Sequence, residues 1–294
     1  MVDYRGLFDQ AEDLLKARIT EFRVATGGYS PATRLICDSD RGKFFLKAGS
    51  TPEIAVQIRR EISVYRRLDS AFMPKIIAAD ERAEVPLLII EDLSDAFWPP
   101  PWSNARVSQV SAAIQAIHQI PTELETFMEV RGNPPHSTST EKSGWSAVEV
   151  DPKPFLNLGI ADEPWLNESL AILVDAESRC STEGDALCHW DIRSDNMCIT
   201  RGGQVKLIDW NLACRSNPDL DLGFWLPSLE LEGGPSPESL LPNAPEIAAW
   251  VSGFFAARAG LPMIPDAPGV RDIQLRQLHK ALPWCVRQLK LRSV

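Results

Sequence analysis

The chain has 294 residues, of which 44% are hydrophobic and 24% are charged, and its formal net charge is −10 at pH 7. This length and apolar content suffice for one large folded domain or two smaller ones, which argues against a disordered chain. The acidic balance gives no general basic surface for phosphate backbones, so we do not expect a nucleic-acid partner. No run of about eighteen apolar residues occurs, so we do not expect a membrane-spanning helix either.

The six cysteines are scattered, with no Cys-x-x-Cys pair and no partnered histidines at zinc-finger spacing. They are Cys37, Cys180, Cys188, Cys198, Cys214 and Cys285. The even number leaves disulfides open, but residues 1–18 carry four carboxylates and no apolar signal-peptide core. Reduced, mostly buried thiols in a cytoplasmic protein are therefore the expectation.

Short runs rich in β-branched and aromatic residues predict strands in the first third of the chain. Two of them, residues 33–37 and 43–47, flank a turn signal at Asp40-Arg41-Gly42. The triplet Thr51-Pro52-Glu53 then supplies a capping hydroxyl, a proline for the first turn and a carboxylate at the positive end of the helix dipole. A helix is predicted from there to residue 68.

Glu61 falls in the middle of the apolar stripe of this predicted helix, between Ile58 and Tyr65. A buried carboxylate needs a cation, and Lys47 at the end of the preceding strand is the candidate. The alternative is that Glu61 lies at the edge of the stripe and reaches water. A buried Lys47–Glu61 pair would indicate a functional charge, because such pairs are costly to desolvate.

Residues 87–93 form a buried-type strand that leads into a Pro-rich stretch at residues 97–102. Helical periodicity dominates beyond it, at residues 107–120, 163–178, 245–257 and 272–291. Residues 122–151 lack periodicity and are expected to be loop. The pattern predicts an α+β protein with an N-terminal lobe at residues 1–94 and a C-terminal lobe at residues 95–294.

The segment from His189 to Asn196 fits the His-x-Asp-x-x-x-x-Asn pattern of kinase catalytic loops. After it, two short strands joined at Arg201-Gly202-Gly203 predict a hairpin. Asn196 lies six residues before Gly202 and Asp209 six after Gly203, so the hairpin would bring the amide and the carboxylate side by side.

Phosphoryl transfer requires oxygen ligands that hold Mg²⁺ on the phosphates and a carboxylate that orients the attacking hydroxyl. Asn196 and Asp209 meet the first need, and Asp191 meets the second as the catalytic base. Arg193 could neutralise charge on the transferred phosphate. His189 is interpreted as a loop-packing residue rather than a proton carrier, since the base is already supplied.

In this order, the motifs resemble the aminoglycoside phosphotransferase and choline kinase group, over roughly residues 24–225. The resemblance implies a protein-kinase-like two-lobed fold, with a small antiparallel sheet plus helix followed by a larger, mainly helical lobe. It implies ATP and Mg²⁺ as cofactors, Lys47 and Glu61 as a phosphate clamp, and Asp221 as a brace for the catalytic loop. For Asp221, a simple charge at a helix N-terminus is the alternative.

The resemblance also implies a nucleotide site built largely from backbone groups. The Glu91 carbonyl and the Leu93 amide would bind adenine where residues 87–93 enter the lobe joint. The turn at residues 26–30, with Gly28 and Ser30, would cover the phosphates, because glycine allows close backbone approach. An ordinary turn at these glycines is the alternative.

The chain also departs from the group, since Trp190 follows His189 where the family usually has glycine. The sequence lacks the Gly-x-Gly-x-x-Gly and Asp-Phe-Gly motifs of protein kinases, which disfavours a protein substrate. The expected acceptor is a hydroxyl of a small molecule, an aminoglycoside-like antibiotic or a hydroxylated metabolite.

The sequence leaves two pairs of alternatives open. The acidic stretch with Glu230, Glu232 and Glu238 could bind an aminated sugar or simply be solvated. A catalytically silent nucleotide-binding regulatory protein of the same fold is the alternative to an enzyme. Lys47, Asp191, Asn196 and Asp209 are all present, which favours the enzyme. The sequence does not fix the oligomeric state.

Overall fold

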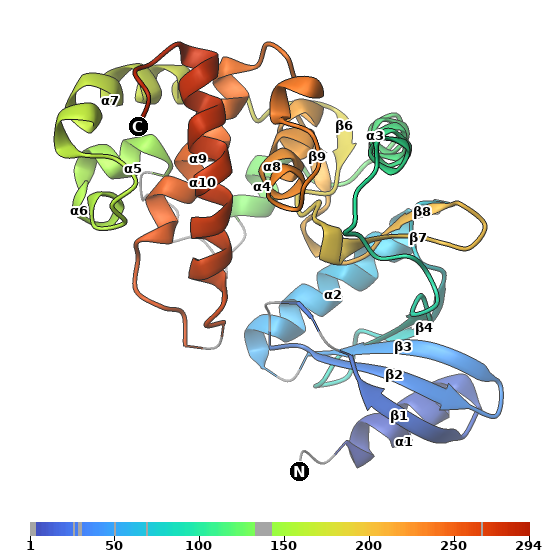
Figure 1. The fold of residues 1–294 in the computed structure, drawn as a ribbon. Coiled ribbons are helices and arrows are strands. Elements are labelled where there is room, and N and C mark those ends of the chain that lie inside the picture. The colour runs from blue at the N-terminus through green and yellow to red at the C-terminus, as the bar shows by residue number, and fades with distance from the viewer. Residues whose placement is uncertain are drawn as a thin grey trace. The chain divides into compact units, whose positions relative to one another are not determined.

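The computed structural model describes residues 4–25, 27–28, 31–49, 51–68, 70–132, 143–265 and 267–294. Its contacts divide the chain into two compact units (Figure 1). The first comprises Met1–Pro99 together with Asp195–Ala213, and the second comprises Pro100–Ser194 together with Cys214–Val294. A later segment of the chain thus returns to the first unit. The boundary at residue 94 between two functional lobes stays a prediction.

The first unit is built on a five-stranded antiparallel sheet in the order β1-β2-β3-β5-β4. The strands are β1 Ile19–Val24, β2 Thr33–Ser39, β3 Gly42–Ala48, β4 Ile76–Asp80 and β5 Leu87–Glu91. The predicted β2–β3 hairpin is confirmed, with Ser39 opposite Gly42. The helix α1 (Arg5–Leu15) packs onto one face, where its Ala11 joins a core with Leu35 and Leu46.

The predicted helix after β3 is confirmed as α2, Pro52–Arg67. The hydroxyl of Thr51 caps it by accepting the Ile54 N–H at 3.4 Å. Its apolar face buries Ile54, Ile58 and Tyr65, and Glu61 is buried among them. The helix therefore carries one carboxylate into an otherwise apolar interior.

The returning segment, residues 195–213, forms the predicted short hairpin. Its strands are β7 (Met197–Ile199) and β8 (Val205–Leu207), with Met197 opposite Leu207. The short 3₁₀ turns η1 (Ser194–Asn196) and η2 (Trp210–Leu212) lie at its two ends. Phe97 forms a two-way backbone bridge with Ile199, which ties the hairpin to the end of the N-terminal segment.

The second unit is mainly helical. Its longer helices are α3 Asn104–His118, α7 Glu163–Ser178, α8 Pro218–Leu231, α9 Pro245–Ala259 and α10 Val270–Leu289. The shorter elements are α4 Phe127–Gly132, α5 Trp145–Val150, α6 Lys153–Leu156, η3 Pro237–Ser239 and the paired strands β6 Ala186–Cys188 and β9 Cys214–Ser216.

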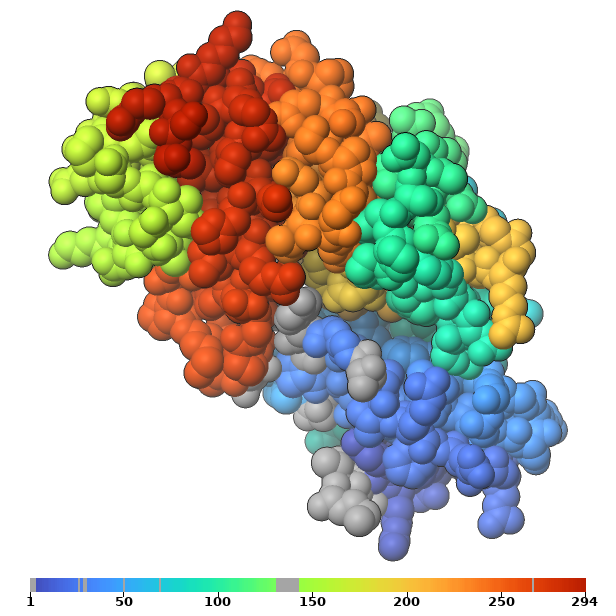
Figure 2. Space-filling model, viewed as in Figure 1, coloured from blue at the N-terminus to red at the C-terminus, as the bar shows by residue number. Residues whose placement is uncertain are grey.

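The helix α9 is the centre of this unit and packs against α5, α6, α7, α8 and α10. Fully buried tryptophans fill the spaces between the helices, among them Trp145, Trp165, Trp225 and Trp284. The surface helix α10 covers much of the face of this unit seen in Figure 2, where it is drawn in red. The predicted α+β class, a small antiparallel sheet with a helix and a helical C-terminal region, is confirmed.

Two differences from the sequence prediction have physical causes. Residues 122–151 are not all loop, because α4 and α5 are helical and Trp145 and Val148 of α5 are buried. One or two helical turns are too short to show periodicity. Helical periodicity also did not indicate α8, since this helix is largely apolar around its circumference and contains Pro227; only the interpretation of Asp221 implied a helix there. Among the described helices, none has the length and apolar content needed to cross a bilayer.

Candidate active site

Lys47 is the charged centre of the first unit. Its Nζ lies 2.7 Å from Glu61 Oε2 and 2.7 Å from Asp209 Oδ1. Lys47 is 7% exposed and Glu61 is 2% exposed, so Glu61 does not reach water. The structure thus brings together the predicted pair and adds Asp209, a contact that the sequence did not indicate. Asp209 keeps 24% of its side chain exposed.

Burial and charge act against each other in this cluster. Burial by itself lowers the pKa of Lys47, but the carboxylates of Asp209 and Glu61 outweigh it, so that the pKa of Lys47 is raised. Burial raises the pKa of Glu61, and Lys47 opposes that rise. Lys47 therefore carries its positive charge at neutral pH, between two carboxyl groups.

The hairpin places Asn196 and Asp209 at the same end, as the spacing predicted. The N–H of Ile208, the residue before Asp209, donates to the Asn196 carbonyl at 2.9 Å. Asn196 is 4% exposed, and Asp209 adopts a left-handed backbone with φ of 66°. Amide and carboxylate oxygens are the donors that Mg²⁺ prefers, so the residues present fit a magnesium ion.

Asp191 and Arg193 belong to the second unit, on the loop that follows β6. Arg193 Nη1 donates to Asp191 Oδ1, and about a quarter of each side chain is exposed. The Asp191 N–H donates to His189 Nδ1 at 3.3 Å, and His189 is fully buried. His189 therefore supports the loop from inside, in line with its predicted packing role.

Asp221 of α8 fixes the backbone of this loop. Its Oδ2 accepts the His189 N–H at 2.9 Å, and its Oδ1 accepts the Trp190 N–H at 2.7 Å. His118 at the end of α3 lies 3.0 Å from Asp221 Oδ2 through its Nε2. Asp221 is fully buried, so these contacts replace its hydration. His118 could not be identified from the sequence, because nothing marks this position there except that it follows the apolar residue Ile117.

The remaining predicted nucleotide residues lie around the sheet. Gly28 has φ of 78°, a conformation that favours glycine, and it follows β1. Ser30 lies outside the described residues. Glu91 ends β5, and its side chain contacts Lys206 at 2.7 Å and the Lys75 N–H at 2.8 Å. The Leu93 carbonyl accepts the Trp98 indole N–H at 3.1 Å.

The three acids of the stretch around η3 are paired within the second unit. Glu230 contacts Lys280 at 3.4 Å, and Arg287 donates to both oxygens of Glu238 at 2.6 and 3.2 Å. The third, Glu232, accepts from the Trp102 indole and from the Ser194 hydroxyl. These internal contacts do not favour a site for an aminated sugar.

The fold is similar to that of solved kinase-like structures. APH(4)-Ia, an aminoglycoside phosphotransferase solved as a thermostable mutant with ADP and hygromycin B, has a TM-score of 0.59 at 15% identity, over 97% of this chain and 98% of that one. The choline kinase LicA from Streptococcus pneumoniae has a TM-score of 0.61 at 15% identity, over the same shares of the two chains. At these identities the likeness establishes a protein-kinase-like fold.

A model described as the phosphotransferase enzyme family matches residues 21–284, and the chain belongs to this family. Among curated proteins, sperm motility kinases 3A and 3B of Mus musculus are 24% identical over 188 residues. That match covers 60% of this chain and 34% of theirs, so the chain spans about a third of the length of these relatives.

Proposed function

We propose that the chain transfers the γ-phosphate of ATP to a hydroxyl group of a small molecule. The observation that carries this proposal is the buried Lys47, held at 2.7 Å by both Glu61 and Asp209. An ammonium group that two carboxyl groups hold in place and keep charged is suited to bind phosphate oxygens. Family membership supports the reaction class, and the solved neighbours bound to ADP or AMP support a nucleotide as the donor.

Each residue of the first unit has a defined task in this proposal. Lys47 binds the α- and β-phosphates, and Glu61 orients it. Asn196 and Asp209 would hold Mg²⁺, which when bound neutralises charge on the phosphates. Gly28, with the neighbouring Ser30, covers the phosphates, while the backbone of Glu91 and Leu93 binds adenine.

The residues of the second unit act on the acceptor. The acceptor oxygen forms a bond to the γ-phosphorus while the bond to the β,γ-bridging oxygen breaks, and ADP leaves. Asp191 accepts the hydrogen bond of the attacking hydroxyl and takes its proton. Arg193, bonded to Asp191 in the structure, orients this carboxylate and supplies positive charge near the transferred group.

The nucleotide half of the proposal is tested by titrating ATP into the protein with and without Mg²⁺. We expect Mg²⁺-dependent binding that Asp209→Asn abolishes and that Lys47→Ala weakens about 10- to 100-fold, the value of a lost charge-assisted contact. Lys43→Ala is the matched control, because Lys43 lies on the same strand with 64% of its side chain exposed. Equal losses in both lysine variants would contradict the assigned role.

A further inference from the structure

Aromatic side chains gather around Trp190, the residue before the proposed base, in the second unit. They come from α4, the catalytic loop, α8 and α9, and all are half-buried: Phe127, Trp190, Phe224, Trp250 and Phe254. We call these five residues the aromatic cluster. Trp190 connects the aromatic cluster to the proposed base, because Trp190 directly precedes Asp191 in the sequence.

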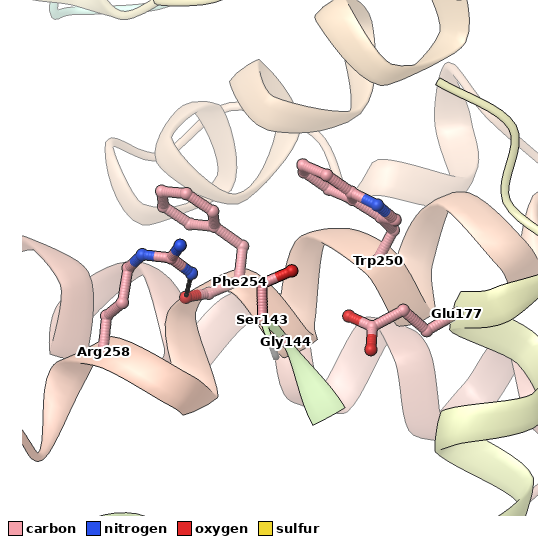
Figure 3. A pocket seen from close by; sticks show the side chains of 6 residues that line it. All are labelled: Ser143, Gly144, Glu177, Trp250, Phe254 and Arg258. Atoms are coloured by element: carbon pink, nitrogen blue, oxygen red, sulfur yellow. Dashed lines mark hydrogen bonds between the residues drawn. The ribbon is translucent and has the colours of Figure 1, made fainter. Parts of the chain in front are cut away.

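Ring contacts connect the whole cluster. Trp190 stacks on Phe127, with centroids 4.2 Å apart and planes at 20°. It also meets Phe224 and Trp250 edge-on or tilted, at 5.7 and 5.8 Å. Phe254 extends the cluster along α9, where it lies 5.1 Å from Phe224. Figure 3 shows Trp250 and Phe254 projecting from the same side of α9.

Trp190 is held at an energetic cost. Its φ of 64° is a left-handed conformation that a bulky residue rarely adopts, at about 1–2 kcal/mol. Its indole N–H is buried and has no acceptor among the described residues. The Asp221 carboxylate fixes the Trp190 N–H in this conformation. Strain of this kind beside a reacting group indicates a functional use of the side chain.

The charges around the cluster argue against a polycationic acceptor. Arg258 already places its guanidinium carbon 4.0 Å from the centroid of the Phe254 ring. Glu230 and Glu238 are paired with Lys280 and Arg287. A hollow of about 150 Å³ is lined by Trp250, Phe254, Arg258, Glu177, Ser143 and Gly144 (Figure 3). It is smaller than ordinary ligand sites and does not by itself hold a ring.

We propose that the acceptor carries a flat aromatic ring that stacks on the aromatic cluster, with Trp190 as the specificity-determining residue. This inference rests on the proposed function, since it concerns the acceptor of the same reaction. A neutral ring gains stacking and apolar burial there without competing with Arg258. Trp190 places this cluster one residue from Asp191 in the sequence.

The test uses three alcohols that share a hydroxyethyl group: phenethyl alcohol, choline, and neohexyl alcohol, which is the uncharged isostere of choline. Their dissociation constants are measured by ligand-observed NMR with the full chain, Mg²⁺ and a non-hydrolysable ATP analogue. We expect phenethyl alcohol to bind about 3- to 10-fold more tightly than neohexyl alcohol, as expected for aromatic stacking. Tightest binding of choline, or no preference, would overturn the proposal.

Variants separate the cluster from general effects on folding. Trp190→Gly relieves the backbone strain and should abolish the preference for phenethyl alcohol, while Trp190→Phe should keep part of it. Phe254→Leu should reduce the preference, whereas Phe22→Leu, at a half-exposed phenylalanine of β1 in the first unit, should not. An unchanged preference in Trp190→Gly would overturn the inference.

The same samples distinguish this inference from the proposed function. Binding of the ATP analogue depends on Lys47 and Asp209 and should survive in Trp190→Gly. If Mg²⁺-dependent nucleotide binding is present but the ring preference is absent, the acceptor inference alone is wrong. If nucleotide binding itself is absent, the proposed function fails and the inference fails with it.

Discussion

Lys47 and Asp209 are 162 residues apart in the chain, yet their charged groups lie 2.7 Å from each other. The contact joins the β3 strand to the end of the β7–β8 hairpin within the first unit. Because the ammonium is shared with the buried Glu61, three charges depend on one another. The ammonium of Lys47 is therefore already held in place for a phosphate group that would bind there.

Removal of Lys47 should destabilise the fold. In Lys47→Met, the carboxylates of Glu61 and Asp209 lose their ammonium, and we expect a loss of about 3–5 kcal/mol in the free energy of unfolding. Adding Glu61→Leu should restore most of it, because the apolar face of α2 then becomes uniform. Urea denaturation measures both, with the exposed Lys43→Met expected within about 0.5 kcal/mol of wild type. A double variant no more stable than Lys47→Met would contradict this explanation.

Asp221 should matter more to stability than its neighbour Asp219. Asp221→Ala leaves one buried and one partly buried backbone N–H group without an acceptor, at about 1–3 kcal/mol each. Asp219 is exposed in the first turn of α8, so Asp219→Ala should cost only about 0.3–1 kcal/mol. Thermal or urea unfolding compares the two. Equal effects would mean that Asp221 acts only as a helix N-terminal charge.

His118 should act through Asp221 rather than on substrate. We expect His118→Gln to lower kcat about 3- to 10-fold while the dissociation constant for Mg²⁺-ATP is unchanged, because only the catalytic-loop anchor is weakened. His279, on α10, is a histidine to which no role is assigned, and His279→Gln serves as the control. A larger change in nucleotide affinity than in kcat would contradict this positioning role.

The elements with strong local signals could be predicted from the sequence. Helix α2 has a hydroxyl cap and a proline start, α7 has a proline start, and the β7–β8 hairpin has its Gly-Gly turn. Contacts set by tertiary packing could not be predicted. The Lys47–Asp209 contact and the His118–Asp221 contact join distant segments, and periodicity carries no information about such pairs.

Because its thiols are buried, the folded protein should lose free energy of unfolding at alkaline pH. Burial raises the pKa of Cys285 to about 12, whereas the unfolded thiol ionises near its ordinary pKa of about 8.5. Burial of the protonated Cys285 thiol therefore makes its full contribution to the free energy of unfolding below about pH 8.5. That contribution is lost as the pH rises toward 12. Between about pH 8 and pH 10, Cys285 should account for up to roughly 2 kcal/mol of the loss.

The comparison of wild type with Cys285→Ala isolates this effect, since all other titrating groups are common to the two proteins. Urea denaturation at the two pH values should show a smaller alkaline loss in the variant, whatever its stability at neutral pH. Native Cys285 should also fail to react with a thiol reagent until the protein unfolds. An identical pH dependence in both proteins would show that the thiol ionises equally in the folded state.

Phosphoryl transfer to a small-molecule hydroxyl is the activity that most directly tests the proposed function. Phosphorus NMR follows Mg²⁺-ATP incubated with the protein and a panel of aminoglycosides, choline, homoserine and aromatic alcohols, with Asp191→Asn in parallel. We expect a new phosphomonoester signal with equimolar ADP, formed at least about 100-fold more slowly by the variant at unchanged ATP affinity. A phosphomonoester formed equally fast by Asp191→Asn, or a wild-type protein that does not bind Mg²⁺-ATP, would contradict it.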